Sequence, residues 1–397
     1  MHFPGRSRWR QVASAATLAL VLASCAVEQN APQDTFKPES AEARRIHSLA
    51  VPVFAIAIAV GIFVYALLAI CVIKFRRRDD DHVPVQVHGN GKLEAVWGVI
   101  PALMLIVVGF FSVPQIFKQA EDPKDAYNIT VIGHQWWWEY QYPQVGETRM
   151  NPSLVSIQDP NDLAKAKEEN RDPKFLGKIL KQDKPVITTA NELHIPAGKK
   201  VRLLITSRDV MHNYWVPKLA GKIYAIPGRL NHLNLSSDAN DAGKTIYGQC
   251  AEFCGTSHAN MRFKVVIDSP AGFDTWLANQ AKPAVETSDE LAKAGEALFK
   301  GGAGCTGCHW TDPSRTNGYE VVKSSTGEES LVKNIGPNLA HFGVRKHFAG
   351  AIAESNTRNL KAWLRNPQEF KPGSRMVIRK LSEDEVNKLV AYVQSLK

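Results

Sequence analysis

The sequence predicts three kinds of structure in order along 397 residues: a two-helix transmembrane hairpin, an all-β domain and an all-α domain. Two long uncharged stretches, a series of short β-rich runs and a final amphipathic helical periodicity lead to this prediction. The net charge of +9 comes from dispersed basic residues, apart from one tight run at 74–78 that follows an apolar segment. This distribution favours a membrane as a partner and argues against nucleic acid.

The N-terminus predicts export from the cytoplasm. Residues 1–24 combine three arginines with an apolar run that is too short to span a bilayer, which is typical of a signal peptide. The run ends in Leu22-Ala23-Ser24-Cys25, which resembles the lipobox of bacterial lipoproteins. The resemblance implies cleavage before Cys25 and lipidation of its sulfur. An ordinary buried or free cysteine after a plain signal peptide is the alternative.

Residues 25–118 are predicted to contain two membrane spans. The uncharged stretches 49–73 and 95–117 are each long enough to cross a hydrocarbon core of ~30 Å at about 1.5 Å per residue. The loop between them begins with a cluster of lysine and arginine, which places it in the cytoplasm by the positive-inside rule. Both termini would then face outward, as the export signal also requires. We therefore expect a protein of the bacterial inner membrane with its large domains on the periplasmic or outer face.

Residues 119–280 are predicted to form a β-sandwich. Short runs rich in β-branched and aromatic residues recur at 128–132, 192–196, 201–206 and 263–267, with turn signals between them. A charged, proline-containing stretch at 145–184 interrupts this pattern. We interpret it as a surface insertion that is partly helical around 162–169.

Residues 288–397 are predicted to be helical, after a linker at 281–287. Ser288 can cap a first amphipathic helix, and Ser382 with Glu385 has capping-box spacing before a second one. The spacing predicts a compact helical domain at the C-terminus.

Four of the six cysteines occur as close pairs, Cys250 with Cys254 and Cys305 with Cys308. In an exported protein each pair could form a disulfide. Cys71 stands alone within the first span, and we predict no functional role for it.

The segment 250–261 contains an unusually soft set of metal-binding groups. Cys250 and Cys254 are followed by His258 and Met261 within a dozen residues, and thiolate, imidazole and thioether groups together favour copper. Zinc is the alternative, but four-coordinate zinc sites rarely use a thioether. The β-rich context and the distant His212 fit a cupredoxin-like sandwich better.

Together with His212 and the string 248–254, this segment resembles the dicopper motif of cytochrome c oxidase subunit II, and the resemblance covers about 42–277. It implies a binuclear copper centre, CuA, in which Cys250 and Cys254 bridge the two ions and His212 and His258 each bind one. The weak outer ligands would be Met261 and the carbonyl of Glu252. The side chain of Glu252 would reach a magnesium or manganese ion at the interface with the catalytic subunit I.

The same resemblance implies two further roles. Trp136, in the aromatic string 133–138, would be the point where electrons enter, and Glu94 would lie near the mouth of a proton pathway in the catalytic subunit. Aromatic packing and a solvated loop carboxylate are the respective alternatives. At Tyr224 the family commonly has an acidic residue that helps to dock a basic soluble cytochrome c. Its absence is a reason to expect electrons to arrive first at the C-terminal domain.

The string Cys305-Thr306-Gly307-Cys308-His309 is a C-x-x-C-H motif, which is the attachment signature of c-type haem. Two thioethers would anchor the porphyrin and His309 would bind the iron. A zinc ribbon usually needs a second cysteine pair, and a redox disulfide does not need the histidine. Met376 is the only methionine after Cys308 and is the candidate sixth ligand. The region 288–397 resembles class I cytochrome c, including Gly336-Pro337-Asn338-Leu339.

The predicted function is an electron relay within a terminal cytochrome c oxidase. A soluble or membrane-bound cytochrome c, or another donor, would reduce the haem, which would reduce the dicopper centre. The catalytic haem-copper subunit would then reduce oxygen to water with proton translocation, so the enzyme activity belongs to the assembly. A free-standing membrane electron carrier is the main alternative. Nitrous oxide reduction would need a histidine-rich catalytic domain, copper storage would not need haem, and quinol-oxidising relatives typically lack these copper ligands.

Overall fold

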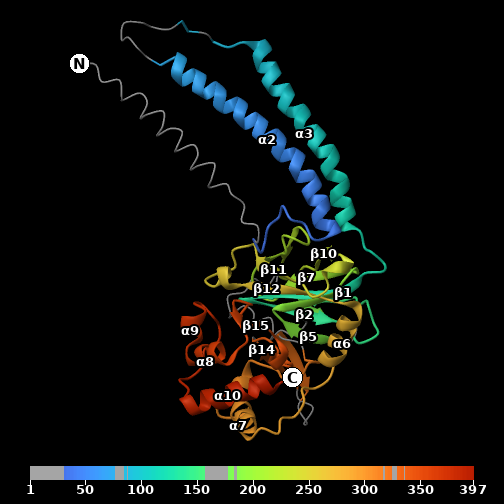
Figure 1. The fold of residues 1–397 in the computed structure, drawn as a ribbon, viewed down its shortest axis with the longest axis vertical. Helices are drawn as coiled ribbons and strands as arrows, with labels where there is room; N and C mark the ends of the chain where they lie inside the picture. The colour runs from blue at the N-terminus through green and yellow to red at the C-terminus, as the bar shows by residue number, and fades with distance from the viewer. Residues whose placement is uncertain are drawn as a thin grey trace, which may run out of the picture.

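The computed structural model describes residues 31–76, 85–86, 88–156, 178–182, 186–315, 318–323, 329–334 and 336–397. Two long helices extend from one end of a β-domain, and a mostly helical C-terminal domain lies against its other end (Figure 1). The predicted signal peptide, the lipidation site at Cys25 and the helix predicted around 162–169 lie outside the described residues.

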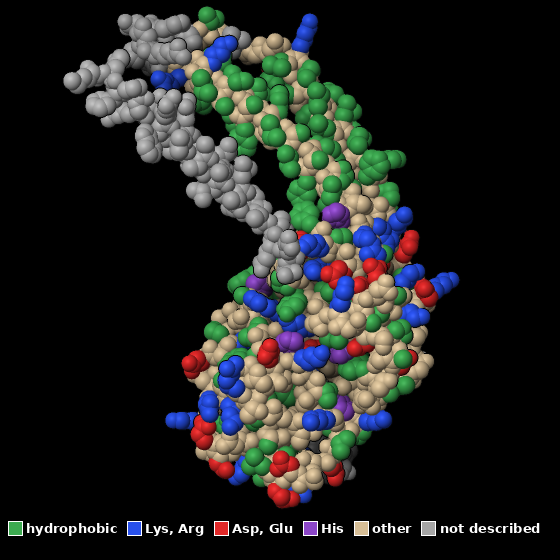
Figure 2. Space-filling model, viewed as in Figure 1, with side chains coloured by type: hydrophobic (Ala, Val, Ile, Leu, Met, Phe, Trp, Pro, Cys, Tyr) green, Lys and Arg blue, Asp and Glu red, His purple; other side chains and the backbone are tan. Residues whose placement is uncertain are grey.

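The hairpin consists of α2 (Ala41–Lys74) and α3 (Gly91–Ala120), both long and apolar enough to span a membrane. Each extends beyond the predicted span at both ends. The earlier starts are explained by Ser40 and Asn90, which cap the helices with side chains that accept hydrogen bonds from first-turn amides. Apolar side chains cover the visible surface of both helices (Figure 2). The start of α2 contacts the β-domain, where Arg44 forms a 2.7 Å ion pair with Asp238.

The β-domain is a sandwich of two five-stranded sheets. The first has the order β10-β7-β1-β2-β5, with β1 (Tyr127–His134), β2 (Trp137–Tyr142), β5 (Ile187–Ala190), β7 (Lys200–Ser207) and β10 (Asn231–Ser236). The second has the order β6-β12-β11-β8-β9, with β6 (Glu192–Pro196), β8 (His212–Trp215), β9 (Lys222–Ala225), β11 (Thr245–Cys250) and β12 (Arg262–Asp268). The pairs β1–β7 and β6–β12 are parallel, and the other pairs are antiparallel.

One hydrophobic core lies between the two sheets and includes the fully buried side chains of Trp138, Leu203, Tyr214 and Phe263. All four β-rich runs of the sequence lie in strands, so the predicted sandwich is confirmed. Helix α6 (Pro270–Gln280) follows the last strand. Two additional strands at the ends of the insertion, β3 (Ser153–Ser156) and β4 (Lys178–Lys181), pair with each other and were not predicted.

The C-terminal domain contains α7 (Glu290–Lys300), α8 (Thr357–Arg365), α9 (Pro367–Phe370) and α10 (Glu383–Ser395). Two small antiparallel pairs interrupt the helices, β13 (Gly318–Lys323) with β14 (Glu329–Asn334), and β15 (His347–Phe348) with β16 (Ala353–Glu354). Short 3-10 turns lie at Cys305–Gly307 and Phe342–Val344 in this domain, and at Ala239–Asp241 and His258–Asn260 in the β-domain.

The capping predictions had different outcomes. Ser382 and Glu385 form the predicted capping box at the start of α10. The prediction for Ser288 was wrong, because Asp289 caps α7 and its carboxylate accepts a hydrogen bond from the Leu291 amide. An ionised carboxylate also interacts favourably with the positive end of the helix dipole.

Candidate functional site

The six predicted copper-binding groups lie together at one end of the second sheet. His212 begins β8 and Cys250 ends β11, and these strands pair so that Cys250 lies opposite Tyr214. The loop after β11 carries Cys254, then His258 at the start of a 3-10 turn and Met261 at its end. Strand pairing therefore brings His212 to a loop that is distant in sequence.

The two cysteine sulfurs occupy the middle of this cluster. They lie 3.8 Å apart, well beyond the ~2.05 Å of a disulfide bond, and both cysteines are free thiols. His212 Nδ1 is 3.9 Å from the Cys250 sulfur, and His258 Nδ1 is 3.5 Å from the Cys254 sulfur. The cluster therefore excludes the disulfide alternative in this structure.

The outer positions are filled by two weaker donors. The Glu252 carbonyl oxygen lies 3.3 Å from the Cys250 sulfur, and the Met261 sulfur lies 3.8 Å from the Cys254 sulfur. Two central thiols with one imidazole and one weak donor on each side fit a pair of soft ions that share bridging ligands. The donor set therefore suits copper.

Neighbouring groups orient the ligands and adjust their charge. His212 donates from Nε2 to Asp209 Oδ1 at 2.8 Å, which leaves Nδ1 facing the sulfurs. Burial alone would lower the pKa of His212, but its hydrogen bonds with Asp209 and Cys250 raise that pKa to about 9. The hydrogen bond that Cys250 shares with Cys254 lowers the pKa of the Cys250 thiol despite its burial. The thiolate form is the one that binds metals.

Gly133 on β1 leaves room for the His212 ring. A Cβ added there would lie 2.7 Å from His212 Cδ2 and 3.3 Å from the Trp138 ring. We expect Gly133→Ala to displace the imidazole and to reduce bound copper, measured as copper per protein, because overpacking a buried site forces neighbours to move. Gly109→Ala on α3, where an added methyl meets no atom of this chain within 4 Å, is the matched control. Unchanged copper content in Gly133→Ala would contradict the prediction.

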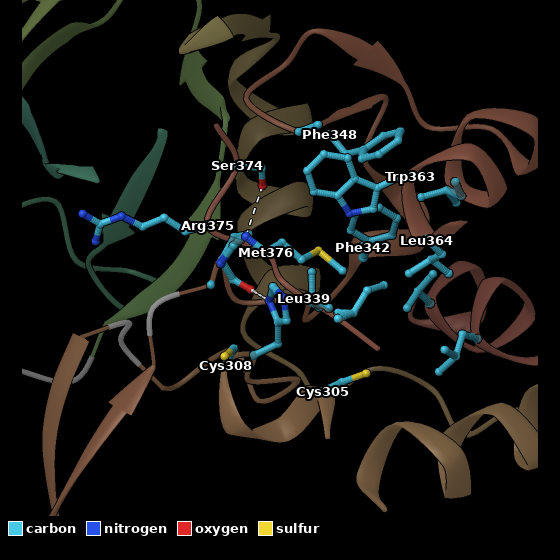
Figure 3. Close-up of a pocket in the computed structure, with 18 of the residues that line it drawn as sticks. Cys305, Cys308, Leu339, Phe342, Phe348, Trp363, Leu364, Ser374, Arg375 and Met376 are labelled. Atoms are coloured by element: carbon cyan, nitrogen blue, oxygen red, sulfur yellow. Dashed lines mark hydrogen bonds between the residues drawn. The ribbon is translucent and has the colours of Figure 1, made fainter. Parts of the chain in front are cut away.

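A cavity of about 490 Å³ lies mainly in the C-terminal domain, and a few residues of the β-domain, among them Trp136, complete its wall. Cys305, Cys308 and His309 line it, and Met376 reaches it from the loop before α10. Figure 3 places Met376 against the apolar part of the wall, which is formed by Leu339, Phe342, Phe348, Trp363 and Leu364. An apolar cavity with two thiols, an imidazole and a thioether fits a c-type haem.

The His309 ring is held in one orientation. Its Nδ1 donates a hydrogen bond to the Pro337 carbonyl at 2.8 Å, so Nε2 remains available for a metal ion. A Cβ at Gly336 would lie 2.4 Å from His309 Cε1, so only glycine allows this close approach. Burial lowers the pKa of His309 and favours the neutral imidazole that binds iron.

Trp136 lies between the two clusters. Only 8% of its surface is exposed, it is one of the residues that line the cavity, and its Nε1 donates to the Cys254 carbonyl at 3.0 Å. Gln135 donates to the same carbonyl at 2.7 Å. The Trp136 side chain is thus packed, as the alternative interpretation predicted, and it also connects the cavity wall to Cys254, a predicted copper ligand. Its role where electrons enter stays a prediction.

Glu94 and Tyr224 lie in different parts of the structure, Glu94 at the start of α3 and Tyr224 on β9 opposite Asn213, the residue after His212. Glu94 lies in the first turn of α3 and accepts a hydrogen bond from the Asn90 amide at 3.2 Å, so in this chain it acts as a helix cap. Tyr224 is an exposed residue of β9. Asp209 and Gln135, which form hydrogen bonds with the predicted ligands His212 and Cys254, were missed because a polar residue in a turn has no distinguishing pattern in the sequence.

Comparison with known proteins agrees with both clusters. The family described as "Cytochrome C oxidase subunit II, periplasmic domain" matches residues 127–269, and the transmembrane domain of the same subunit matches 30–115. Subunit 2 of cytochrome c oxidase from Alkalihalophilus pseudofirmus is 31% identical, over 96% of this chain and 95% of the relative. The chain belongs to the cytochrome c oxidase subunit II family. A third family, "Cytochrome c", matches residues 292–397.

Two further comparisons extend over different parts of this subunit II chain. Subunit 2 from Bacillus subtilis is 29% identical over 98% of each chain. The crystal structure of the periplasmic domain of subunit II from Bradyrhizobium japonicum is 29% identical, covering 40% of this chain and 95% of that chain, with a TM-score of 0.27.

Family membership identifies the broad role of the chain. A subunit II with a cytochrome c domain has an electron-transfer role in a terminal oxidase, as part of a membrane complex with subunit I. The subunit II domain implies dicopper, the cytochrome c domain implies haem, and the donor sets described above fit both groups.

Proposed function

We propose that this chain relays electrons from a covalently bound haem c to the dicopper centre and then to the catalytic subunit, which reduces oxygen to water and translocates protons. The observation that carries this proposal is the position of Trp136, a residue that lines the haem cavity and whose Nε1 donates to the Cys254 carbonyl. One side chain thus connects the two candidate redox sites.

The haem and the two coppers supply one-electron redox chemistry when bound, and the protein residues hold and orient them. Cys305 and Cys308 would form the thioethers, and His309 and Met376 would be the axial ligands. A methionine ligand raises the potential of a haem. Cys250, Cys254, His212, His258, Met261 and the Glu252 carbonyl would hold the coppers within a rigid β scaffold, which limits rearrangement when the charge changes.

Electrons are proposed to enter through the cytochrome domain, because Trp136 is only 8% exposed and its carbonyl accepts a hydrogen bond from Lys371 of that domain. The donor would be a soluble or membrane-bound cytochrome c or another reductant. Both termini would face the periplasm, with Cys25 lipidated. Glu252 would reach a magnesium or manganese ion shared with subunit I, and Glu94 would lie near a proton pathway of that subunit.

An anaerobic redox titration of the full chain with optical and EPR detection tests the relay. We expect a c-type haem band that survives acidic organic extraction, because the haem is covalent, together with a mixed-valence dicopper signal. Co-purification of subunit I separates the oxidase from a free-standing electron carrier. Absence of either spectroscopic signal from the native chain would overturn the proposed function.

A further inference from the structure

Two buried ionisable side chains form contacts across the interface between the copper domain (127–268) and the cytochrome domain (290–397). Lys371 belongs to the cytochrome domain, is 4% exposed, and donates from Nζ to the Trp136 carbonyl of the copper domain at 2.6 Å. Glu192 belongs to the copper domain and is also 4% exposed. Its carboxylate accepts hydrogen bonds from the Lys346 amide at 3.1 Å and the His347 amide at 2.8 Å. Each domain therefore binds a buried ionisable side chain of the other through hydrogen bonds. Burial lowers the pKa of Lys371 to about 7, so this contact depends on its N–H groups rather than on a permanent charge.

Both contacts use several hydrogen bonds, as a buried charge requires. Lys371 also donates to the Ala349 carbonyl of its own domain at 3.0 Å. The His347 ring adds a third bond to Glu192, from Nδ1 at 2.9 Å. Burial raises the pKa of Glu192, but the bonds from His347 and from the Lys346 amide outweigh it, and the resulting pKa lies below the usual value. Glu192 is therefore an anion that these N–H groups stabilise.

The backbones of the two domains also touch beside the copper loop. Gly350 accepts a hydrogen bond from the Arg262 amide at 3.1 Å, and a Cβ at Gly350 would lie 2.6 Å from the Asn260 carbonyl oxygen. A Cβ at Gly373 would lie 2.8 Å from Thr256 Cβ. These positions have no space for a side chain, so the domains are packed without a gap at this edge.

The contacts of Lys371 and Glu192 lie next to the residues that the relay would use for electron transfer. Lys371 and His347 both line the haem cavity, and Lys371 is five residues before Met376 in the same loop. The acceptor of the Lys371 bond is the carbonyl of Trp136, whose indole in turn donates to Cys254. Movement at either contact would therefore change the separation between haem and copper.

We propose that Lys371 and Glu192 are positioning residues that clamp the cytochrome domain onto the copper domain and thereby set the rate of electron transfer from haem to copper. The inference rests on the proposed relay and adds the contacts that would control the distance between its two redox centres. Neither residue is a redox group or a ligand of one. Both act by fixing the distance between the haem held by one domain and the dicopper centre held by the other.

The test uses the full chain with Lys371→Met and Glu192→Gln, alone and combined. Methionine keeps most of the length of lysine without its charge, and glutamine keeps the shape of glutamate. Ascorbate with a small redox mediator reduces the haem, and rapid-mixing spectroscopy follows haem and copper separately. We expect unchanged haem reduction and unchanged midpoint potentials, with haem-to-copper transfer at least about tenfold slower in the double variant. Lys293→Met, which removes an exposed surface ion pair with Glu290, should leave both rates unchanged.

Each outcome decides the proposal. Unchanged internal transfer in the double variant overturns it. Loss of the haem band in Lys371→Met would show that Lys371 is needed to fold the Met376 loop and would overturn its positioning role. Glu192→Gln, in β6 outside both ligand loops, would then decide the role of Glu192. A failed relay would instead appear in the native chain, as the absence of a redox centre.

Discussion

Replacing Cys250 with serine should abolish the mixed-valence dicopper signal and reduce electron delivery to the catalytic subunit to background. The Cys250 sulfur is central to the cluster, 3.8 Å from the Cys254 sulfur, 3.9 Å from His212 Nδ1 and 3.3 Å from the Glu252 carbonyl oxygen. A serine hydroxyl stays protonated at neutral pH and is a hard donor, so it cannot replace a bridging thiolate. EPR spectroscopy and oxygen consumption with an artificial donor measure the two effects.

Two comparisons make the Cys250→Ser result specific. The haem band should remain, because the haem attachment and axial residues belong to the cytochrome domain and Cys250 does not line the haem cavity. Cys71→Ser, on the exposed surface of α2, should leave the copper signal intact. A dicopper signal that persisted in Cys250→Ser would show that this sulfur does not bridge the ions.

The copper-binding residues that lie close together in the sequence could be predicted from its local pattern alone, whereas the distant ligand could not. Cys250, Cys254, His258 and Met261 lie in one loop, so their shared chemistry is visible in the sequence alone. His212 is 38 residues before Cys250, and only the family resemblance linked it to the loop. The physical link is the pairing of β8 with β11, a non-local contact that residue spacing does not encode.

The domain interface could not be predicted at all. Lys371 and Glu192 look like ordinary surface charges in the sequence, because charged residues are rarely buried unless they are paired. Their burial depends on how two separately folded domains pack, and no periodic pattern within either domain records that contact. The cap of α7 shows the same limit on a small scale, since Ser288 and Asp289 are both good capping residues and local packing selects the second.

Replacing Met376 with alanine should change the haem and spare the copper. Alanine has no donor atom for the iron, so we expect altered haem absorption and a lower midpoint potential, measured by an optical redox titration. The loop should keep its place, because Lys371 donates to the Trp136 carbonyl and Arg375 donates to the Gln135 side chain. Loss of the ligand can therefore be separated from loss of the fold.

Met261→Ala is the reciprocal variant, because the Met261 sulfur lies 3.8 Å from the Cys254 sulfur and is buried in the copper domain. It should alter the dicopper EPR signal and leave the haem potential unchanged. An unaltered haem spectrum in Met376→Ala would mean that another group holds the sixth position and that Met376 only fills the cavity wall. Opposite spectroscopic effects of the two variants would instead assign one methionine to each centre, which is the arrangement that two adjacent but separate redox sites require.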